Sequence, residues 1–403
     1  TVQAMGNPVV MLSNTGTATV KTFDTTTGAF VFNGASANTI VYYYPALPVM
    51  GLLTRERGQI NDEEFIGFDT RFSYTFNGTG WEVISSVYHW NGADSQFFWA
   101  ANYRGTLNSD RLFFVTNNNV ADLMSYYDGA TWTVFNPIYN SLTGDRVQTA
   151  RIIIPFQNRL VLLNTVEQLG GGTEIYLNRA RFSQNGNPIE VSAFYEPPTN
   201  FGRGDHIDAP TAEAIISAQI LKDRLIVFFE RSTWELVYTG NQVVPFVWQT
   251  INIELGAEST FSMVPFDKVL LGVGDVGIMA CNGANVERID EKIPNEVFQI
   301  HNSNQGPERV YGVRDYNSEM VYWTFPDSKS VGTNTFPSRI LVYNYRNGSY
   351  AINDDGITCF GQFQFDSSIT WDNTDFTWDE ADFPWNEGEN QNKARNVIAG
   401  NAE

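Results

Sequence analysis

The sequence contains few cysteines, few histidines and no long apolar run. Its 403 residues include two cysteines and three histidines. The histidines (His89, His206 and His301) are scattered, and no pair has the spacing of zinc ligands, so no zinc site is predicted. Cys281 and Cys359 lie in strand-like runs; we expect buried small apolar side chains, with a disulfide as the alternative. No apolar run approaches the roughly twenty residues of a membrane-spanning helix, which predicts no membrane span.

Basic residues are scarce beside acidic ones. The chain has 25 Lys and Arg against 45 Asp and Glu, a formal net charge of −20. This sign is wrong for gripping phosphates, so the composition argues against a protein that captures nucleic acid. An acidic surface keeps a protein soluble and repels DNA. The excess is greatest in residues 366–389, which hold eight carboxylates and no Lys or Arg.

Segments that favour a helix are also rare. The best candidate is 211–221, yet its apolar residues suit a strand equally well. What the chain has instead is a repeated hairpin, in which an apolar strand and a tight turn precede a second strand that usually starts with an aromatic residue. Five clear copies recur about every fifty residues, at 75–82, 126–133, 228–235, 280–287 and 343–350. Two weaker copies lie around 25–30 and 183–188.

The turn residues explain why these hairpins should form. Four copies carry Asn-Gly or Asp-Gly at the turn, ending at Gly78, Gly129, Gly283 and Gly348. These dipeptides tolerate the positive φ that tight hairpin turns need. The flanking runs are rich in β-branched and aromatic residues, which favour a pleated sheet. We therefore expect the aromatics that open the second strands to occupy equivalent positions in the repeat: Trp81, Trp132, Trp234 and Tyr350.

A period near fifty with several short strands per unit predicts a β-propeller. We expect an all-β fold with six or seven antiparallel blades and irregular loops. The predicted division is an N-terminal arm or incomplete first blade (1–40), the propeller (41–365), and an acidic aromatic-repeat loop with a terminal strand (366–403). Residues 396–399 are a candidate to close the ring by completing a sheet begun near 9–12.

The two ends of the chain leave its completeness open. Residues 395–400 look like an incoming strand and turn, which favours a fragment of a longer protein. Removal of an initiator Met would also explain Thr1.

The acidic segment carries a seven-residue repeat that starts at Trp371, Trp378 and Trp385. Its Thr, Asn, Asp and Pro residues and its lack of an aliphatic seam argue against a coiled coil. The strip from Trp371 to Glu389 has three interpretations: an extended loop pinned on its own propeller by its rings, a calcium loop, or a docking strip for a partner. Calcium would use Asp372, Asp375, Asp379 and Asp382, although the glycine and final glutamate of an EF-hand are missing.

No motif in the sequence indicates a catalytic or cofactor-binding site. Residues 125–132 resemble the Asp-box of sialidase propellers, but Gly129 follows Asp128 directly. The tripeptide Arg203-Gly-Asp205 is too short to be specific. The glycine runs at 170–172 and 272–274 lack the Lys-Ser/Thr of a phosphate loop. We therefore predict a protein that is not an enzyme and has no catalytic, cofactor-binding or metal-binding residues.

Several runs together resemble a known family. The segments 204–210, 221–236, 254–259 and 273–278 are similar to the propeller of phage tail nozzle and tail hub proteins, the tail tubular protein B-like proteins of short-tailed phages. Further matches occur at 50–56, 97–103, 112–117 and 126–132, and the Thr-Trp-Asp repeats at 370–379 also recur in proteins of this kind, so the resemblance spans roughly residues 50 to 400. The first fifty residues match no pattern of this family.

The resemblance implies a structural virion protein, assembled in the host cytoplasm. Copies would form a homo-oligomeric ring, sixfold in such tails, that contacts adaptor and fibre proteins. Genome DNA would be ejected through its channel without tight binding. Two rival hypotheses remain: a carbohydrate-binding or glycan-hydrolysing propeller, and a protein-interaction propeller. An Arg/Glu/Tyr cluster at the propeller axis would favour the first rival, and a monomer with one exposed apolar patch the second.

Overall fold

The computed structural model describes most of the chain between residues 47 and 364. The described ranges are 9–13, 19–23, 30–33, 40–44, 47–57, 63–78, 80–85, 90–104, 111–197, 202–293, 307–327, 336–364 and 395–402. His89, His301 and the strip from Trp371 to Glu389 lie outside them. In the described part of the chain, no helix is long and apolar enough to cross a membrane.

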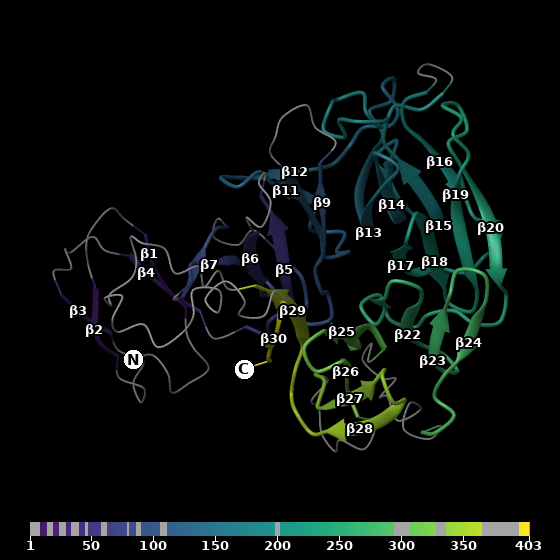
Figure 1. Ribbon diagram of the computed structural model, residues 1–403. Helices are drawn as coiled ribbons and strands as arrows, with labels where there is room; N and C mark the ends of the chain where they lie inside the picture. The colour runs from purple at the N-terminus through teal and green to yellow at the C-terminus, as the bar shows by residue number, and fades with distance from the viewer. Residues whose placement is uncertain are drawn as a thin grey trace, which may run out of the picture.

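Six four-stranded antiparallel sheets form the blades of a β-propeller, which confirms the predicted fold class (Figure 1). Within each blade the strands follow one another in sequence order. Blade 1 comprises β5 (Gly51–Glu56), β6 (Glu63–Phe68), β7 (Ser73–Phe76) and β8 (Trp81–Val83). Blade 2 comprises β9 (Trp99–Tyr103), β10 (Leu112–Thr116), β11 (Ser125–Tyr127) and β12 (Trp132–Val134). Blade 3 comprises β13 (Arg146–Phe156), β14 (Arg159–Leu169), β15 (Gly172–Phe182) and β16 (Asp205–Asp208).

The second half of the propeller repeats this arrangement. Blade 4 comprises β17 (Ile215–Leu221), β18 (Arg224–Phe229), β19 (Thr233–Tyr238) and β20 (Phe246–Asn252). Blade 5 comprises β21 (Val264–Pro265), β22 (Leu270–Gly274), β23 (Gly277–Cys281) and β24 (Val286–Arg288). Blade 6 comprises β25 (Tyr311–Asp315), β26 (Met320–Phe325), β27 (Arg339–Asn344) and β28 (Ser349–Asn353). A short 3-10 helix, η3 (Pro307–Arg309), precedes blade 6. The helix candidate at 211–221 is therefore the strand β17.

Stacking of the blades buries both faces of several of their middle strands. β10, β22 and β23 are buried at every position. Their runs are apolar throughout rather than alternating, because each face packs on a neighbouring blade. One apolar cluster joins blades 3 and 4, and another joins blades 4 and 5. Cys281 and Cys359 are both buried and free, so the predicted burial is confirmed and the disulfide alternative is wrong.

The predicted turns form at all four Asn-Gly and Asp-Gly sites. Gly78, Gly129, Gly283 and Gly348 have φ of 94°, 105°, 86° and 67°. At Gly129 a side chain would also meet the Arg55 guanidinium, 2.6 Å from an ideal Cβ position. These glycines are thus required by backbone conformation, and Gly129 also by a close approach.

The repeated hairpin occupies a different position in blade 4 than in the other blades. The hairpins at 75–82, 126–133, 280–287 and 343–350 join the third and fourth strands of their blades, but the hairpin at 228–235 joins the second and third strands of blade 4. Trp234 therefore lies on a third strand, and its predicted equivalence with Trp81, Trp132 and Tyr350 is wrong. Of the weaker copies, 183–188 follows β15 without a second strand until Asp205, and the other lies between β2 (Thr19–Phe23) and β3 (Phe30–Asn33), outside the blades.

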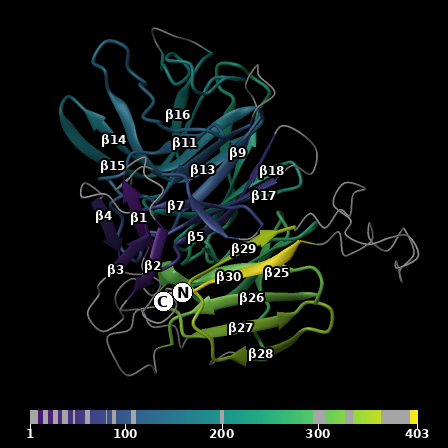
Figure 2. The same cartoon turned by 90° about the vertical axis from the view of Figure 1, so that its left-hand side faces the viewer.

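A two-stranded sheet closes the ring between blade 6 and blade 1. β29 (Cys359–Phe363) pairs with β30 (Asn396–Gly400) and packs between β25 and β5 (Figure 2). Thr54 Oγ1 donates to the Gln362 carbonyl at 2.6 Å, which ties β5 to β29. The terminal strand at 396–400 was expected, but its predicted partner is wrong: β1 (Val9–Ser13) pairs with β4 (Ile40–Tyr44) instead. The proposed domain boundaries stay a prediction.

Candidate functional site at the propeller axis

The first strands of successive blades surround a cavity at the propeller axis. Each first strand contacts the next, and β29 completes the circle between β25 and β5. The cavity has a volume of about 320 Å³. Its walls mix aromatic rings with polar groups, among them Trp99, Phe261, Tyr311, Gln219, Arg314 and Gln362. The size and composition suit water or a small polar ligand.

Two stacked rings form part of the cavity wall. Phe261 and Tyr311 lie with their centroids 5.1 Å apart and their planes 6° from parallel. The Gly312 amide donates to the Phe261 carbonyl at 2.8 Å and fixes this approach. A side chain at Gly312 would come within 2.7 Å of the Trp323 ring, so the strand needs glycine there. Burial raises the pKa of the Tyr311 hydroxyl, which therefore stays protonated in the neutral range.

A second cavity of about 240 Å³ also includes Thr260 and Phe261 in its wall. Arg151 of β13 and Glu308 of η3 face each other in it, with Arg151 Nη2 2.6 Å from Glu308 Oε1. Arg151 Nε also donates to Thr260 Oγ1 at 2.8 Å. Arg309 reaches Asp94 with a 3.0 Å ion pair. The ion pairs made by η3 therefore join blade 3 to the segment before blade 6, and that segment to the one before blade 2.

A glycan-hydrolysing site would bring Arg, Glu and Tyr together, but here these residue types lie in two separate cavities. Arg151 and Glu308 line the second cavity and are paired with each other, whereas Tyr311 and Arg314 line the first. A nucleophilic tyrosine would need a lowered pKa or an adjacent base, while burial moves the pKa of Tyr311 upward. The Arg/Glu/Tyr cluster that would favour a glycan-hydrolysing site is therefore not assembled in one cavity among the described residues.

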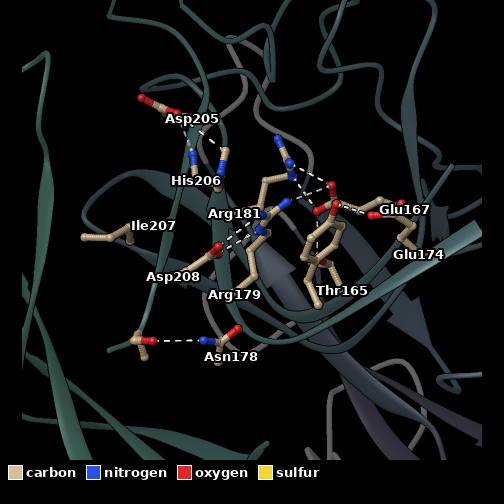
Figure 3. A network of polar contacts seen from close by, with 12 residues as sticks. Thr165, Glu167, Glu174, Asn178, Arg179, Arg181, Asp205, His206, Ile207 and Asp208 are labelled. Carbon is tan, nitrogen blue, oxygen red and sulfur yellow. Dashed lines mark hydrogen bonds and ion pairs between the residues drawn. The ribbon is translucent and has the colours of Figure 1, made fainter. Parts of the chain in front are cut away.

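A second polar cluster spans β14, β15 and β16 of blade 3 (Figure 3). Arg181 is 1% exposed and forms two hydrogen bonds to the Glu167 carboxylate, at 2.8 and 2.9 Å. Arg179 holds Asp208 in the same bidentate manner, at 2.7 and 2.9 Å. Thr165 donates a further hydrogen bond to Glu167 at 2.7 Å. These contacts link β14, β15 and β16 by charge-assisted hydrogen bonds inside the sheet.

Three side chains of this cluster offer donor atoms to a cation. The ligand atoms of Glu196, Asp205 and His206 all lie within 4.8 Å of one another. Glu196 Oε1 is 2.8 Å from His206 Nδ1 and also accepts a hydrogen bond from Arg181. The guanidinium already neutralises Glu196, so a metal ion would have to displace or tolerate a neighbouring positive charge. The trio fits a protein ion network better than a metal centre.

The pKa values in this cluster move in both directions. The hydrogen bond from Arg179 lowers the pKa of the Asp208 carboxyl despite partial burial. Burial raises the pKa of Asp205, and this outweighs the opposing hydrogen bond from the His206 backbone amide. Burial would also raise the pKa of Glu196, but His206 and Arg181 together lower it. The pKa values of the neighbouring Asp205 and Asp208 carboxyls are thus shifted in opposite directions.

The short sequence motifs considered as possible sites lie in structural positions of the fold. Arg203 pairs with Glu190 at 3.0 Å, and Asp205 lies in the cluster beside His206, so both charged ends of the tripeptide have internal contacts. The glycines at 170–172 form the β14–β15 turn, and those at 272–274 lie inside the buried strand β22. The carboxylates proposed for calcium lie in the undescribed strip.

Neither cluster follows from a sequence motif. Arg151 and Glu308 are 157 residues apart, and no local pattern connects them. Arg179 and Arg181 did carry a signal: two arginines alternate within the strand-like run 175–182. Charged residues at alternating positions of a strand share one face, so partners for them on a neighbouring strand could have been expected.

Comparison with known proteins adds little to this description. No family model matches the chain, and no curated protein matches it either. Among solved structures the chain is similar to BBS1N, in the crystal structure of BBS1N in complex with ARL6DN soaked with mercury. That similarity has a TM-score of 0.43 and 11% identity, and covers 79% of this chain and 85% of that chain.

Proposed function

We propose that the chain is a structural subunit of a short-tailed phage tail. Its copies would form a ring-shaped nozzle or hub, sixfold by analogy with the family that the sequence resembles, and they would contact adaptor and fibre proteins in the virion. The observation that carries the proposal is the net charge of −20 on a propeller-folded chain. A wall of such subunits would repel DNA phosphates and let a duplex slide past without binding.

The size of the axial cavity supports a wall element rather than a pore. The major groove of duplex DNA alone is about 12 Å wide, and a cavity of about 320 Å³ is too small to admit a duplex. Any DNA channel would therefore be the space enclosed by several copies. Each propeller would contribute one sector of its wall, and the closure of the propeller by β29 and β30 suits a rigid wall element.

Duplex binding tests this proposal. Fluorescence anisotropy of a labelled duplex should show no binding at physiological salt, because repulsion replaces the counterion release that drives ordinary DNA binding. Lowering the salt should not reveal binding, since weaker screening strengthens the repulsion. Tight binding that weakens steeply with added salt would contradict a DNA-repelling wall.

A carbohydrate-binding propeller is the second candidate, favoured by the aromatic and polar lining of the axial cavity. A sugar would place its ring on an aromatic face, and Gln219 or Gln362 would bind its hydroxyls. Calorimetric titration with a panel of mono- and disaccharides tests this idea, with Gln219→Ala as the variant that should weaken binding. Release of reducing sugar from glycans would establish a hydrolase. The protein-interaction propeller remains a third hypothesis.

A further inference from the structure

The outer strand of blade 4 differs from the outer strands of the other blades. β20 is seven residues long, whereas β8, β12 and β24 have three, β16 has four and β28 has five. Figure 1 shows β20 at the right-hand rim of the propeller. Among the described residues no strand pairs with its outer side, since β20 ends the order of its sheet. Long unpaired edges are a liability that proteins usually avoid.

The edge formed by β20 also lacks the charged residues that prevent pairing with another strand. The fourteen residues from Gly240 to Ile253 contain no Asp, Glu, Lys or Arg, in a chain in which charged residues make up 17%. Three of the five shorter outer strands carry charges that deter pairing: Glu82 in β8, Asp205 and Asp208 in β16, and Glu287 in β24. Along and beside β20, Val243, Val244 and Val247 are 53%, 51% and 39% exposed. The edge thus combines length, neutrality and exposed apolar side chains.

The backbone of β20 is available for pairing. The Thr239 amide donates to the Pro245 carbonyl at 2.9 Å, and Val247 lies opposite Val237 in the register. Backbone groups alternate in direction along an antiparallel strand. Val247 and Gln249 therefore turn their amides and carbonyls toward β19, and those of Trp248 and Thr250 point to the open side.

The side chains of β20 are self-complementary. In an antiparallel pair centred on Gln249, Gln249 lies opposite itself, and Val247 lies opposite Ile251 of the second copy, the extra residue where the register of β20 with β19 shifts. Trp248 and Thr250 of the second copy then match as well, and both have outward backbone groups. One face thus places apolar residues against apolar residues and an amide against an amide. Such a surface, complementary to itself, is what a two-fold contact requires.

We propose that β20 is a docking edge for a second copy of this chain, joined by antiparallel β20–β20 pairing about a two-fold axis. Two chains of charge −20 repel each other, and the fourteen-residue neutral stretch is where they can approach without placing carboxylates in contact. The pairing would continue the four strands of blade 4 into an eight-stranded sheet across the two copies.

This inference does not rest on the proposed phage function. A two-fold contact joins copies in pairs, and it neither requires nor creates a closed ring. A wild-type dimer without rings would support the β20 contact and count against the proposed ring. Rings whose mass is insensitive to changes in β20 would do the reverse.

Charge substitution at Gln249 tests the two-fold axis directly. Because Gln249 would face its own copy, Gln249→Glu places two carboxylates opposite each other, and Gln249→Lys places two ammonium groups there. Sedimentation velocity over a concentration series should show pairwise association of the wild type, as dimers of free chains or as pairs of rings, and each variant alone should raise the dissociation constant by roughly tenfold or more. An equal mixture of the two variants should recover the dimer, because it pairs Glu with Lys.

The exposure of Gln249 separates an effect on association from an effect on folding. Gln249 is exposed, so both variants should unfold at the wild-type urea concentration. Thr133→Glu, an exposed change on the outer strand of blade 2, is the matched control and should leave the dimer intact. A wild-type chain that stays monomeric would overturn the inference. So would a dimer unaffected by Gln249→Glu, or a mixture that fails to re-associate.

Discussion

Arg151 and Glu308 meet at the propeller axis although 157 residues separate them, with Arg151 Nη2 2.6 Å from Glu308 Oε1. The pair joins the first strand of blade 3 to η3, which leads into blade 6. Arg151 is 13% exposed in its side chain and Glu308 36%, so water screens the pair only in part. The contact crosses one end of the axis and ties together blades on different sides of the ring.

Glu308→Gln should lower stability by about 1–2 kcal/mol, because it leaves the guanidinium of Arg151 without its counter-charge in a half-enclosed cavity. Urea unfolding followed by tryptophan fluorescence measures the change. Glu319→Gln is the matched control, since the Glu319–Arg346 pair is far more exposed and should contribute little. Equal losses in the two variants would show that the axial pair has no special role.

Arg181→Met should cost about 3–5 kcal/mol, because Glu167, 1% exposed, would lose the two hydrogen bonds that balance its buried charge. Arg179 lies 3.2 Å from Glu167 and would compensate only in part. The difference in urea midpoint at constant slope gives the value. A loss below 1 kcal/mol would mean that the cluster in blade 3 is not a buried ion network.

Trp132→Ala should destabilise the protein by about 3 kcal/mol. The Trp132 ring packs against Tyr127 and Trp90, with centroids 5.0 and 5.1 Å away. Trp81 stands at the matching position of blade 1 but is 45% exposed, so Trp81→Ala should cost less. Thermal unfolding of the two variants compares them. A larger loss for Trp81→Ala would contradict the packing described for blades 1 and 2.

Asp208 and Asp205 should give opposite pH responses. The hydrogen bond from Arg179 lowers the folded-state pKa of Asp208 below its unfolded value of about 3.9, so its contribution is present above that pH and lost as the pH falls through the folded pKa. The stability gap between wild type and Asp208→Asn should therefore shrink from pH 6 to pH 3. Burial raises the pKa of Asp205, so this carboxyl lowers stability as the pH rises past about 4.

Unfolding free energies of both variants across this range test the signs. As the pH rises, the free energy of unfolding of Asp205→Asn should increase relative to the wild type. That of Asp208→Asn should decrease relative to the wild type. A gap that stays constant with pH for both variants would show that neither carboxyl changes its pKa on folding.

Local chemistry made most of the fold predictable. The turns at Gly78, Gly129, Gly283 and Gly348 follow from backbone conformation alone, and the apolar runs around them could only be buried strands. The placement of each hairpin within its blade did not follow. Trp234 lies in a hairpin that resembles that of Trp132 but lacks an Asn-Gly or Asp-Gly turn, and it joins different strands of its blade. The four hairpins that carry the dipeptide all join third and fourth strands, so the turn residues distinguish this copy, whereas the shared strand-turn-strand pattern does not.

The long-range strand contacts that close the propeller could not be predicted from the sequence. The partner of β30 is β29, which is separated from it by the acidic strip, whereas the expected partner near Val9 pairs with β4. Several apolar segments could have closed the ring equally well by composition. The fit at Gly361 decides it: an ideal Cβ there would lie 2.6 Å from Leu52 Cβ, so β29 can approach β5 only with glycine. Such complementarity appears only in three dimensions.

Electron microscopy of the purified protein tests the central claim most directly. If the chain is a wall subunit of a phage tail, negatively stained particles should include closed rings of several propellers around an open lumen. The claim predicts rings of one copy number, sixfold in the family that the sequence resembles, with a lumen wide enough for duplex DNA. A field of single propellers at every concentration tried, with or without the other tail proteins, would contradict it.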